Sequence, residues 1–198
     1  MLWTPADPLY AFVLAGLASP GPNVIMVTAS GARFGLRRTI PHIFGVVLGV
    51  GITAGLTAFG IGALLLEVPA LTLSLKLAAA GWILWMAYKL ATAQPREASE
   101  AERPFTFVQA VLFQWVNPKV WAVALAASAG FASGLPPLEE ALRIGSAFSG
   151  LNFFVCFFWT FAGSLLAYLL TSPRAWRAFN LCMAAALAAS ALLVIFSG

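Results

Sequence analysis

The sequence predicts an all-α integral membrane protein with six transmembrane helices in a 3+3 inverted-topology repeat. Of its 198 residues 61% are hydrophobic and only 9% are charged, too few to cover a soluble globule of this size. Its apolar runs suit helices of about 20 residues better than the segments of about 10 residues found in membrane β-barrels. Two proline motifs interrupt the first and fourth runs, which predicts that helices 1 and 4 are broken near the bilayer midplane.

Hydropathy divides the chain into six apolar segments, and one polar linker separates them into two groups of three. We expect a single transmembrane domain over residues 1–198, with a first repeat at 1–93, a cytoplasmic linker at 94–104 and a second repeat at 105–198. The expected helices run from Pro8 to Ala32, Thr39 to Leu66, Leu71 to Ala91, Phe105 to Phe131, Ala141 to Leu170 and Ala175 to Phe196.

Basic residues gather in the loops of one membrane side. Most of the 11 Lys and Arg residues lie between predicted helices one and two, three and four, and five and six, whereas the other side holds only Lys76 and Arg143. By the positive-inside rule, the basic loops face the cytoplasm and both termini face outward. The basic residues form no continuous stripe, so they indicate membrane topology and not a nucleic-acid partner.

Each half contains an odd number of helices, so the second half is expected to enter the membrane in the opposite sense to the first. The halves also share a short similarity, Phe-Val-Leu-Ala at 12–15 and Phe-Val-Gln-Ala at 107–110, and a proline motif follows each at a similar distance. Paired breaks in inverted halves are typical of a transporter with its substrate site near the midplane.

The first break is Ser19-Pro20-Gly21-Pro22-Asn23. Pro20 and Pro22 lack amide protons, and Gly21 permits backbone geometry closed to other residues, so one helical turn is expected to unwind. Pro22 suits the first position of a new half-helix. The N–H groups and positive dipole end of that half-helix can hold a carboxylate, and Asn23 adds a side-chain donor and acceptor.

The second break is Asn117-Pro118-Lys119. Asn117 is a favoured N-cap residue and Pro118 fits the first helical position, so a second half-helix is expected to start inside the membrane. An ammonium group at helix-centre depth costs about 3 kcal/mol on insertion scales, which makes Lys119 the leading functional candidate. Two half-helix starts and one cation favour an anionic group such as the carboxylate of an amino acid.

A partner for the substrate's ammonium group is less evident, because Asp7, Glu67, Glu139 and Glu140 all lie near predicted helix ends. Backbone carbonyls released by the breaks, or the side chain of Asn152, are the alternatives. The predicted substrate-binding residues are therefore Pro20, Gly21, Pro22, Asn23, Asn117, Pro118, Lys119 and Asn152.

Several other residues are assigned to packing. The glycines of the second helix, including Gly45 and Gly49, form a small-residue face suited to close helix packing. His42 is expected near the cytoplasmic interface, although a part in an inner gate or proton path stays open. Cys156 and Cys182 lack the spacing of a metal or redox site, so neither a metal nor a cofactor is expected.

Two other function classes stay open beside a carrier. Paired Asn-Pro helix starts also suit an aquaporin-like channel, although the chain is short for extra re-entrant helices and a midplane Lys favours anions. A membrane-embedded enzyme would need a nucleophile with a base, or a metal cluster, and only His42 offers a conventional base. The prediction is therefore a transporter and not an enzyme.

Three motifs resemble those of the LysE/RhtB amino-acid exporters: Ser-Pro-Gly-Pro-Asn at 19–23, Gly-Ala-Arg-Phe-Gly-Leu-Arg-Arg at 31–38 and Phe-Gln-Trp-Val-Asn-Pro-Lys at 113–119. The resemblance covers essentially the whole chain. It implies a six-helix translocator of the bacterial inner membrane that exports amino acids or related metabolites, and it raises a homodimer as the oligomeric state. The family commonly has an acidic residue at the position of Asn23, so the resemblance assigns no proton-coupling role there.

Overall fold

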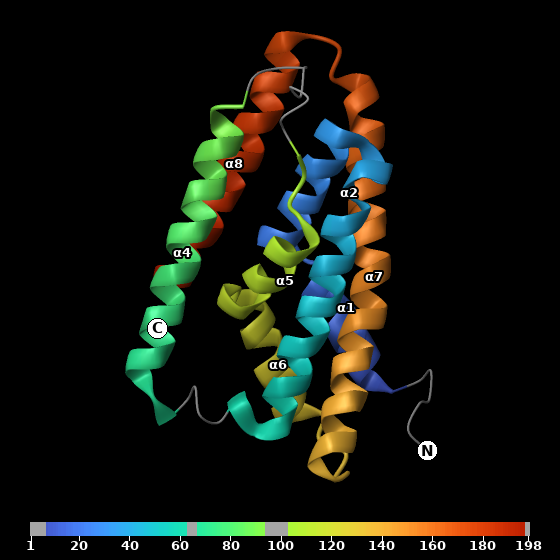
Figure 1. Ribbon diagram of the computed structural model, residues 1–198, viewed down its shortest axis with the longest axis vertical. Helices are drawn as coiled ribbons and strands as arrows, with labels where there is room; N and C mark the ends of the chain where they lie inside the picture. The colour runs from blue at the N-terminus through green and yellow to red at the C-terminus, as the bar shows by residue number, and fades with distance from the viewer. Residues whose placement is uncertain (1–6, 63–66, 94–102, 197–198) are drawn as a thin grey trace.

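The computed structural model describes residues 7–62, 67–93 and 103–196, and within these ranges it contains helices and no strand (Figure 1). The prediction of an all-α protein is therefore confirmed for the described chain. The helices, with one short π-helix labelled η1, are α1 Pro8–Ala18, α2 Pro22–Leu56, η1 Thr57–Ile61, α4 Pro69–Ala91, α5 Phe107–Val116, α6 Pro118–Gly130, α7 Pro137–Leu169 and α8 Pro173–Phe196.

Helix α2 consists of two limbs, 22–34 and 36–56, that reverse at Gly35. Gly35 has φ 76° and ψ 166°, in the left-handed region that favours glycine. Figure 1 shows α2 running to one end of the molecule and then back. The sequence predicted a loop between Ala32 and Thr39, and the structure corrects this to a one-residue break. The predicted end of the second helix, Leu66, lies outside the described residues.

Both proline motifs coincide with helix ends. Helix α1 ends at Ala18 and α2 begins at Pro22, while α5 and α6 meet at Asn117 with a bend of 63°. Gly21 has φ −178° and ψ 179°, an extended conformation that any residue adopts. The expectation that backbone geometry requires glycine at this position was therefore wrong. The depth of the two breaks in a bilayer stays a prediction.

Helix α7 packs closely against both limbs of α2. A Cβ atom on Gly31 would clash with the carbonyl oxygen of Thr160, and one on Gly163 would lie 2.9 Å from the carbonyl carbon of Thr28. On the glycine face of the second limb, a Cβ on Gly45 would clash with the carbonyl oxygen of Phe107, and one on Gly49 would lie 2.9 Å from the carbonyl oxygen of Val111. The close helix packing predicted for this face is therefore confirmed at these two glycines, because the missing side chains let α2 meet the backbone of α5.

Helices α4 and α8 lie side by side along one flank of the molecule (Figure 1). Their contact forms an apolar core in which Ile83 and Leu187 are fully buried. Met26 and Phe113 belong to the same core, so it joins this helix pair to α2 and α5.

Three described helical stretches are long and apolar enough to cross a membrane: Pro22–Ile61, Pro137–Leu169 and Pro173–Ile195. The bent pair of α5 and α6 adds a fourth if it counts as one span, and α1 is short at 11 residues. Because α2 folds back at Gly35, a count of continuous helices does not equal a count of crossings. The six crossings therefore stay a prediction.

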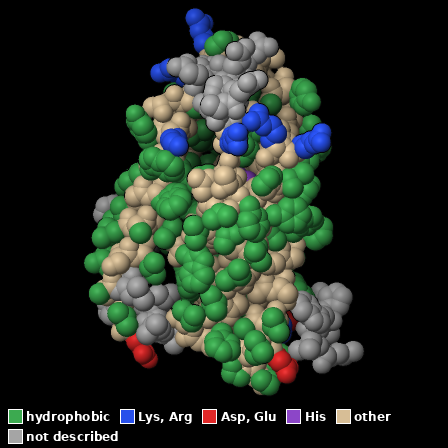
Figure 2. Space-filling model, in the orientation of Figure 1, with side chains coloured by type: hydrophobic (Ala, Val, Ile, Leu, Met, Phe, Trp, Pro, Cys, Tyr) green, Lys and Arg blue, Asp and Glu red, His purple; other side chains and the backbone are tan. Residues whose placement is uncertain are grey.

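Charged side chains separate along the long axis of the molecule. Figure 2 shows Lys and Arg toward one end, Asp and Glu toward the other, and many hydrophobic side chains on the surface between them. We call the end that contains Arg33, Lys89 and Arg103 the basic end. A broad exposed apolar surface with charged ends is typical of a protein embedded in a bilayer.

Candidate functional site

Lys119 at the start of α6 bridges the two helix breaks. Its Nζ donates a hydrogen bond to the carbonyl oxygen of Ser19, just past the end of α1. The aliphatic part of the side chain lies over Gly21, where an added Cβ would be 2.7 Å from Lys119 Cδ and 3.1 Å from Nζ. A side chain at position 21 would therefore displace Lys119 from this path.

An amide network links α2 to α5 and to the second break. Gln114 Nε2 donates to the carbonyl of Ala110 at 2.9 Å and to Asn23 Oδ1 at 3.2 Å. Gln114 Oε1 accepts from Asn23 Nδ2 at 2.8 Å and from Asn117 Nδ2 at 3.3 Å. Gln114 and Asn117 are both buried, where polar groups need such partners. The network therefore holds Asn23 against the second break.

A cavity of about 10 Å³ lies beside Lys119, with room for about one water molecule and not for an amino acid. Pro20, Pro22 and Pro118 lie at the helix breaks without lining it, whereas the other predicted substrate-binding residues all do. The lining residues are Leu17, Gly21, Asn23, Val24, Asn117, Lys119, Val120 and Asn152.

A larger cavity of about 670 Å³ lies at the basic end, between α2, α4, α8 and the start of α5. Its lining includes Arg33, Lys89 and Arg103, and its volume is in the range of small-molecule sites. His42 also lines it and is buried, and its place near the cytoplasmic interface stays a prediction. Its Nδ1 lies 3.2 Å from Ser30 Oγ, and its Nε2 has no partner among the described residues.

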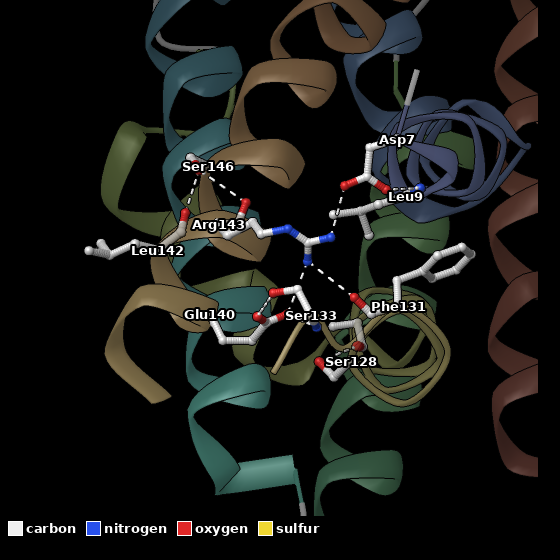
Figure 3. Close-up of polar contacts among 10 residues, drawn as sticks. Asp7, Leu9, Ser128, Phe131, Ser133, Glu140, Leu142, Arg143 and Ser146 are labelled. Carbon is white, nitrogen blue, oxygen red and sulfur yellow. Dashed lines mark hydrogen bonds and ion pairs between the residues drawn. The ribbon is translucent and has the colours of Figure 1, made fainter. Parts of the chain in front are cut away.

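At the opposite end, a largely buried ion-pair cluster joins α1 to α7 (Figure 3). The guanidinium group of Arg143 donates to Asp7 Oδ2 at 2.8 Å, to Glu140 Oε1 at 3.0 Å and to the carbonyl of Phe131 at 3.1 Å. Glu140 in turn accepts a hydrogen bond from the Ser133 hydroxyl. The cluster ties together the start of α1, the end of α6 and the first turns of α7.

Asp7 has a second role as the N-cap of α1. Its Oδ1 accepts a hydrogen bond from the backbone N–H of Leu9 at 2.9 Å. This hydrogen bond, followed by the contact with Arg143, holds the pKa of the Asp7 carboxyl below its ordinary value of 3.8, against the opposing effect of burial. Asp7 is therefore ionised and able to pair with Arg143 at neutral pH.

The chain also matches a protein family along most of its length. The family model described as LysE type translocator matches residues 14–198, a range that contains both breaks, both cavities and Arg143. The chain belongs to the LysE-type translocator family. The family resemblance predicted from the motifs is confirmed, and with its several apolar helices this LysE-type translocator is a multi-pass membrane protein of a transporter family.

Curated relatives of this LysE-type translocator are named as efflux proteins. The cysteine/O-acetylserine efflux proteins of Escherichia coli O1:K1 / APEC, Escherichia coli (strain K12) and Shigella sonnei (strain Ss046) are each 31% identical to it over 111 residues. Each match covers 56% of this chain and 57% of the relative, less than two thirds of the relative's length. No solved structure matches the chain.

Sequence reasoning missed two features of this LysE-type translocator. Gln114 was not among the predicted site residues, although a polar residue inside an apolar helix and within the motif at 113–119 is a usable signal. The pairing of Asp7 with Arg143 joins residues 136 positions apart, and no sequence pattern links them. Both residues were predicted near helix ends, which is where the structure places them.

Proposed function

We propose that this LysE-type translocator exports amino acids or related metabolites across the bacterial inner membrane by alternating access. One observation carries this proposal: residues from both halves of the chain surround a single small cavity. Gly21 and Asn23 come from the first half, and Asn117, Lys119 and Asn152 come from the second. A site between two repeats is what an alternating-access carrier requires.

The substrate's carboxylate binds at the starts of α2 and α6, beside Lys119. Pro22 and Pro118 each occupy the first helical position, and the helix dipole and the backbone N–H groups of the next residues, Asn23 and Lys119, favour an anion there. In the described conformation, the ammonium group of Lys119 donates a hydrogen bond to the neutral carbonyl of Ser19. A carboxylate forms a stronger charge-assisted hydrogen bond, so it displaces this carbonyl when substrate enters.

The described conformation supports access from the basic end. The larger cavity lies there, whereas the cluster of Asp7, Glu140 and Arg143 joins the helices at the opposite end. By the positive-inside rule the basic end faces the cytoplasm and both termini face outward. Rocking of the repeat 1–93 against the repeat 105–198 then separates Asp7 from Arg143 and closes the basic end.

The Asn23–Gln114 pair forms the barrier between the two cavities. Asn23 lines the small cavity, and Met26, about one helical turn further along α2, lines the large one. On α5, Gln109 lines the large cavity while Gln114 bonds to Asn23. Substrate moving from the large cavity to Lys119 therefore has to part this amide pair.

Counterflow in proteoliposomes tests the proposal. Vesicles preloaded with cysteine, O-acetylserine or other amino acids are mixed with labelled substrate, and the names of the curated relatives make the first two compounds the first to try. We expect saturable exchange that Lys119→Met abolishes. The matched control Lys76→Met removes a lysine from α4, away from both cavities, and keeps exchange.

Other results point elsewhere. Flux that rises linearly with concentration and shows no counterflow supports the aquaporin-like channel. Normal exchange by Lys119→Met rejects Lys119 as the centre of the site.

A further inference from the structure

We propose that Asn117 and Asn152 recognise the two charged ends of a zwitterionic α-amino acid. Asn117 Oδ1 accepts a hydrogen bond from the substrate's α-ammonium group, and Asn152 Nδ2 donates one to the carboxylate beside Lys119. This assignment rests on the transport function proposed above and adds to it a reason for rejecting both simple carboxylic acids and simple amines.

Hydrogen bonds fix the orientation of the Asn117 amide. The carbonyl of Ala110 can only accept, so Gln114 turns its NH₂ group toward Ala110, at 2.9 Å. The oxygen of Gln114 then faces Asn23 and Asn117, and both turn their NH₂ groups toward it, at 2.8 Å and 3.3 Å. This leaves Asn117 Oδ1 as a buried acceptor with no partner among the described residues.

Asn152 of α7 has a free hydrogen-bond donor where Asn117 has a free acceptor. Its Oδ1 accepts a weak hydrogen bond from the Cys156 thiol at 3.7 Å, and its Nδ2 is a buried donor without a partner in the described chain. Asn117 is 1% exposed and Asn152 is 2% exposed, and both line the small cavity. Other buried polar atoms also lack partners among the described residues, but of the residues with such atoms only Asn117 and Asn152 line the small cavity, where a ligand can supply the missing partners.

The chemistry of these two atoms selects a zwitterion. An ammonium group has only donors and a carboxylate has only acceptors, so the two ends of an amino acid complement one free acceptor and one free donor. Lys119 is the charged residue among those that line the cavity, so the carboxylate belongs on its side. The ammonium group then meets the neutral oxygen of Asn117 and avoids the like charge of Lys119.

Apart from Asn23, whose amide is engaged by Gln114, the rest of the cavity wall is apolar and comes from both halves of the chain. Leu17 and Val24 lie in the first half and Val120 lies in the second. Because the cavity now measures about 10 Å³, binding has to move these walls apart. An apolar wall offers the substrate's side chain no further charged group, which restricts recognition of charge to the two asparagines and Lys119.

Three related thiols isolate the two ends of the substrate. L-cysteine carries both charged groups, 3-mercaptopropionate lacks the ammonium group, and cysteamine lacks the carboxylate. Their affinities for the purified full-length protein are measured by calorimetry under reducing conditions, with serine, 3-hydroxypropionate and ethanolamine as a second series. The variants are Asn117→Ala, Asn117→Asp and Asn152→Ala. The matched control is Asn180→Ala, a buried asparagine of α8 that lines neither cavity.

We expect the wild type to bind cysteine at least roughly tenfold more tightly than either truncated thiol, since each leaves a buried group unpaired. Asn117→Ala lowers the affinity for cysteine by about tenfold and leaves the affinity for 3-mercaptopropionate unchanged. Asn152→Ala lowers the affinities for cysteine and 3-mercaptopropionate and leaves the affinity for cysteamine unchanged. Asn117→Asp keeps the acceptor and adds a negative charge, so it binds cysteamine more tightly than the wild type. Asn180→Ala changes none of these affinities.

Two results overturn the assignment in distinguishable ways. If the wild type binds cysteine and 3-mercaptopropionate equally, or if both Asn117 variants weaken all three thiols in parallel, the asparagine pair does not recognise the zwitterion, although a carboxylate carrier still stands. If neither series nor O-acetylserine binds to the wild type, the proposed substrate class itself is wrong and the assignment fails with it.

Discussion

At the scale of single residues, the candidate site depends on the lack of a side chain at Gly21. Lys119 crosses from the second break to Ser19 by passing over Gly21, and any Cβ at position 21 would overlap its aliphatic chain. The backbone at Gly21 is extended and accepts any residue, so the constraint on a side chain here is steric, and the atoms nearest to an added Cβ belong to Lys119. A substitution at Gly21 should therefore displace the ammonium group of Lys119 without unfolding the protein.

We expect Gly21→Ala to raise the KM for transport by roughly tenfold while the melting temperature stays close to that of the wild type, because a lysine chain is flexible enough to move aside. Counterflow kinetics and a thermal melt measure the two effects. Gly81→Ala is the control, since no described atom lies within 4 Å of a Cβ at that position. Unchanged kinetics in Gly21→Ala would show that the position of Lys119 does not limit binding.

The sequence predicted which residues meet at the site better than it predicted what each atom does. Proline chemistry indicated both breaks, and Gly21, Asn23, Asn117, Lys119 and Asn152 do line one cavity. The sequence offered Asn152 as a partner for an ammonium group, yet its oxygen is engaged by the thiol of Cys156 and its free atom is a donor. The polarity of an amide depends on neighbours that folding supplies, so the sequence alone did not predict it.

At the scale of helices, the structural effect of a proline is easier to predict from the sequence than that of a glycine. A proline within an apolar run ends or breaks a helix for local reasons, and helices α2 and α6 begin at Pro22 and Pro118 as those reasons require. The reversal at Gly35 was predicted as a longer loop, because a positive φ cannot be told from composition. The contact of Gly31 with Thr160 joins α2 to α7 and likewise depends on tertiary packing.

Gly163→Ala tests this packing. Its Cβ would meet the backbone of Thr28, which cannot move as a side chain can, so we expect the free energy of unfolding to fall by about 1–3 kcal/mol. Gly150→Ala in the same helix is the matched control, because no described atom lies within 4 Å of its Cβ. It should leave stability equal or higher by up to about 1 kcal/mol, as expected for alanine in a helix. Equal melting curves for both variants would contradict the close contact between α2 and α7.

At the scale of the whole molecule, the two ends are built differently. The basic end contains a cavity of about 670 Å³, whereas the other end is joined by the largely buried contact between Asp7 and Arg143. A buried ion pair contributes little net stability after desolvation, and its best supported use is to specify one arrangement over another. We therefore expect this pair to favour the conformation with access from the basic end.

Breaking the pair should shift the molecule toward outward access. Asp7→Asn keeps an N-cap for α1 but loses the charge, and Arg143→Ala removes the other partner. In a Cys182→Ser background, we expect both changes to raise by severalfold the labelling of Leu17→Cys by an impermeant thiol reagent added outside. Arg174→Ala, at the start of α8, is the control and should not change the rate. Labelling that stays constant in folded Asp7→Asn and Arg143→Ala would contradict a role for the pair in closing this end.

The pH dependence of stability gives the ionised state of Asp7 a thermodynamic test. The pKa of Asp7 is lowered in the folded protein from an ordinary value of 3.8, so the unfolded chain takes up the proton first as pH falls. The stabilisation from ionised Asp7 is therefore complete above pH 3.8 and is lost as pH falls through the lower folded pKa. We expect the difference in unfolding free energy between wild type and Asp7→Asn to be constant from about pH 7 to pH 5 and to shrink only below about pH 4. The hydrogen bond from Leu9 and the contact with Arg143 both lower this pKa, so the pH dependence of the difference reports the ionisation of Asp7 through both contacts together. A difference that already changes near pH 6 would mean that a group other than Asp7 controls this end of the molecule.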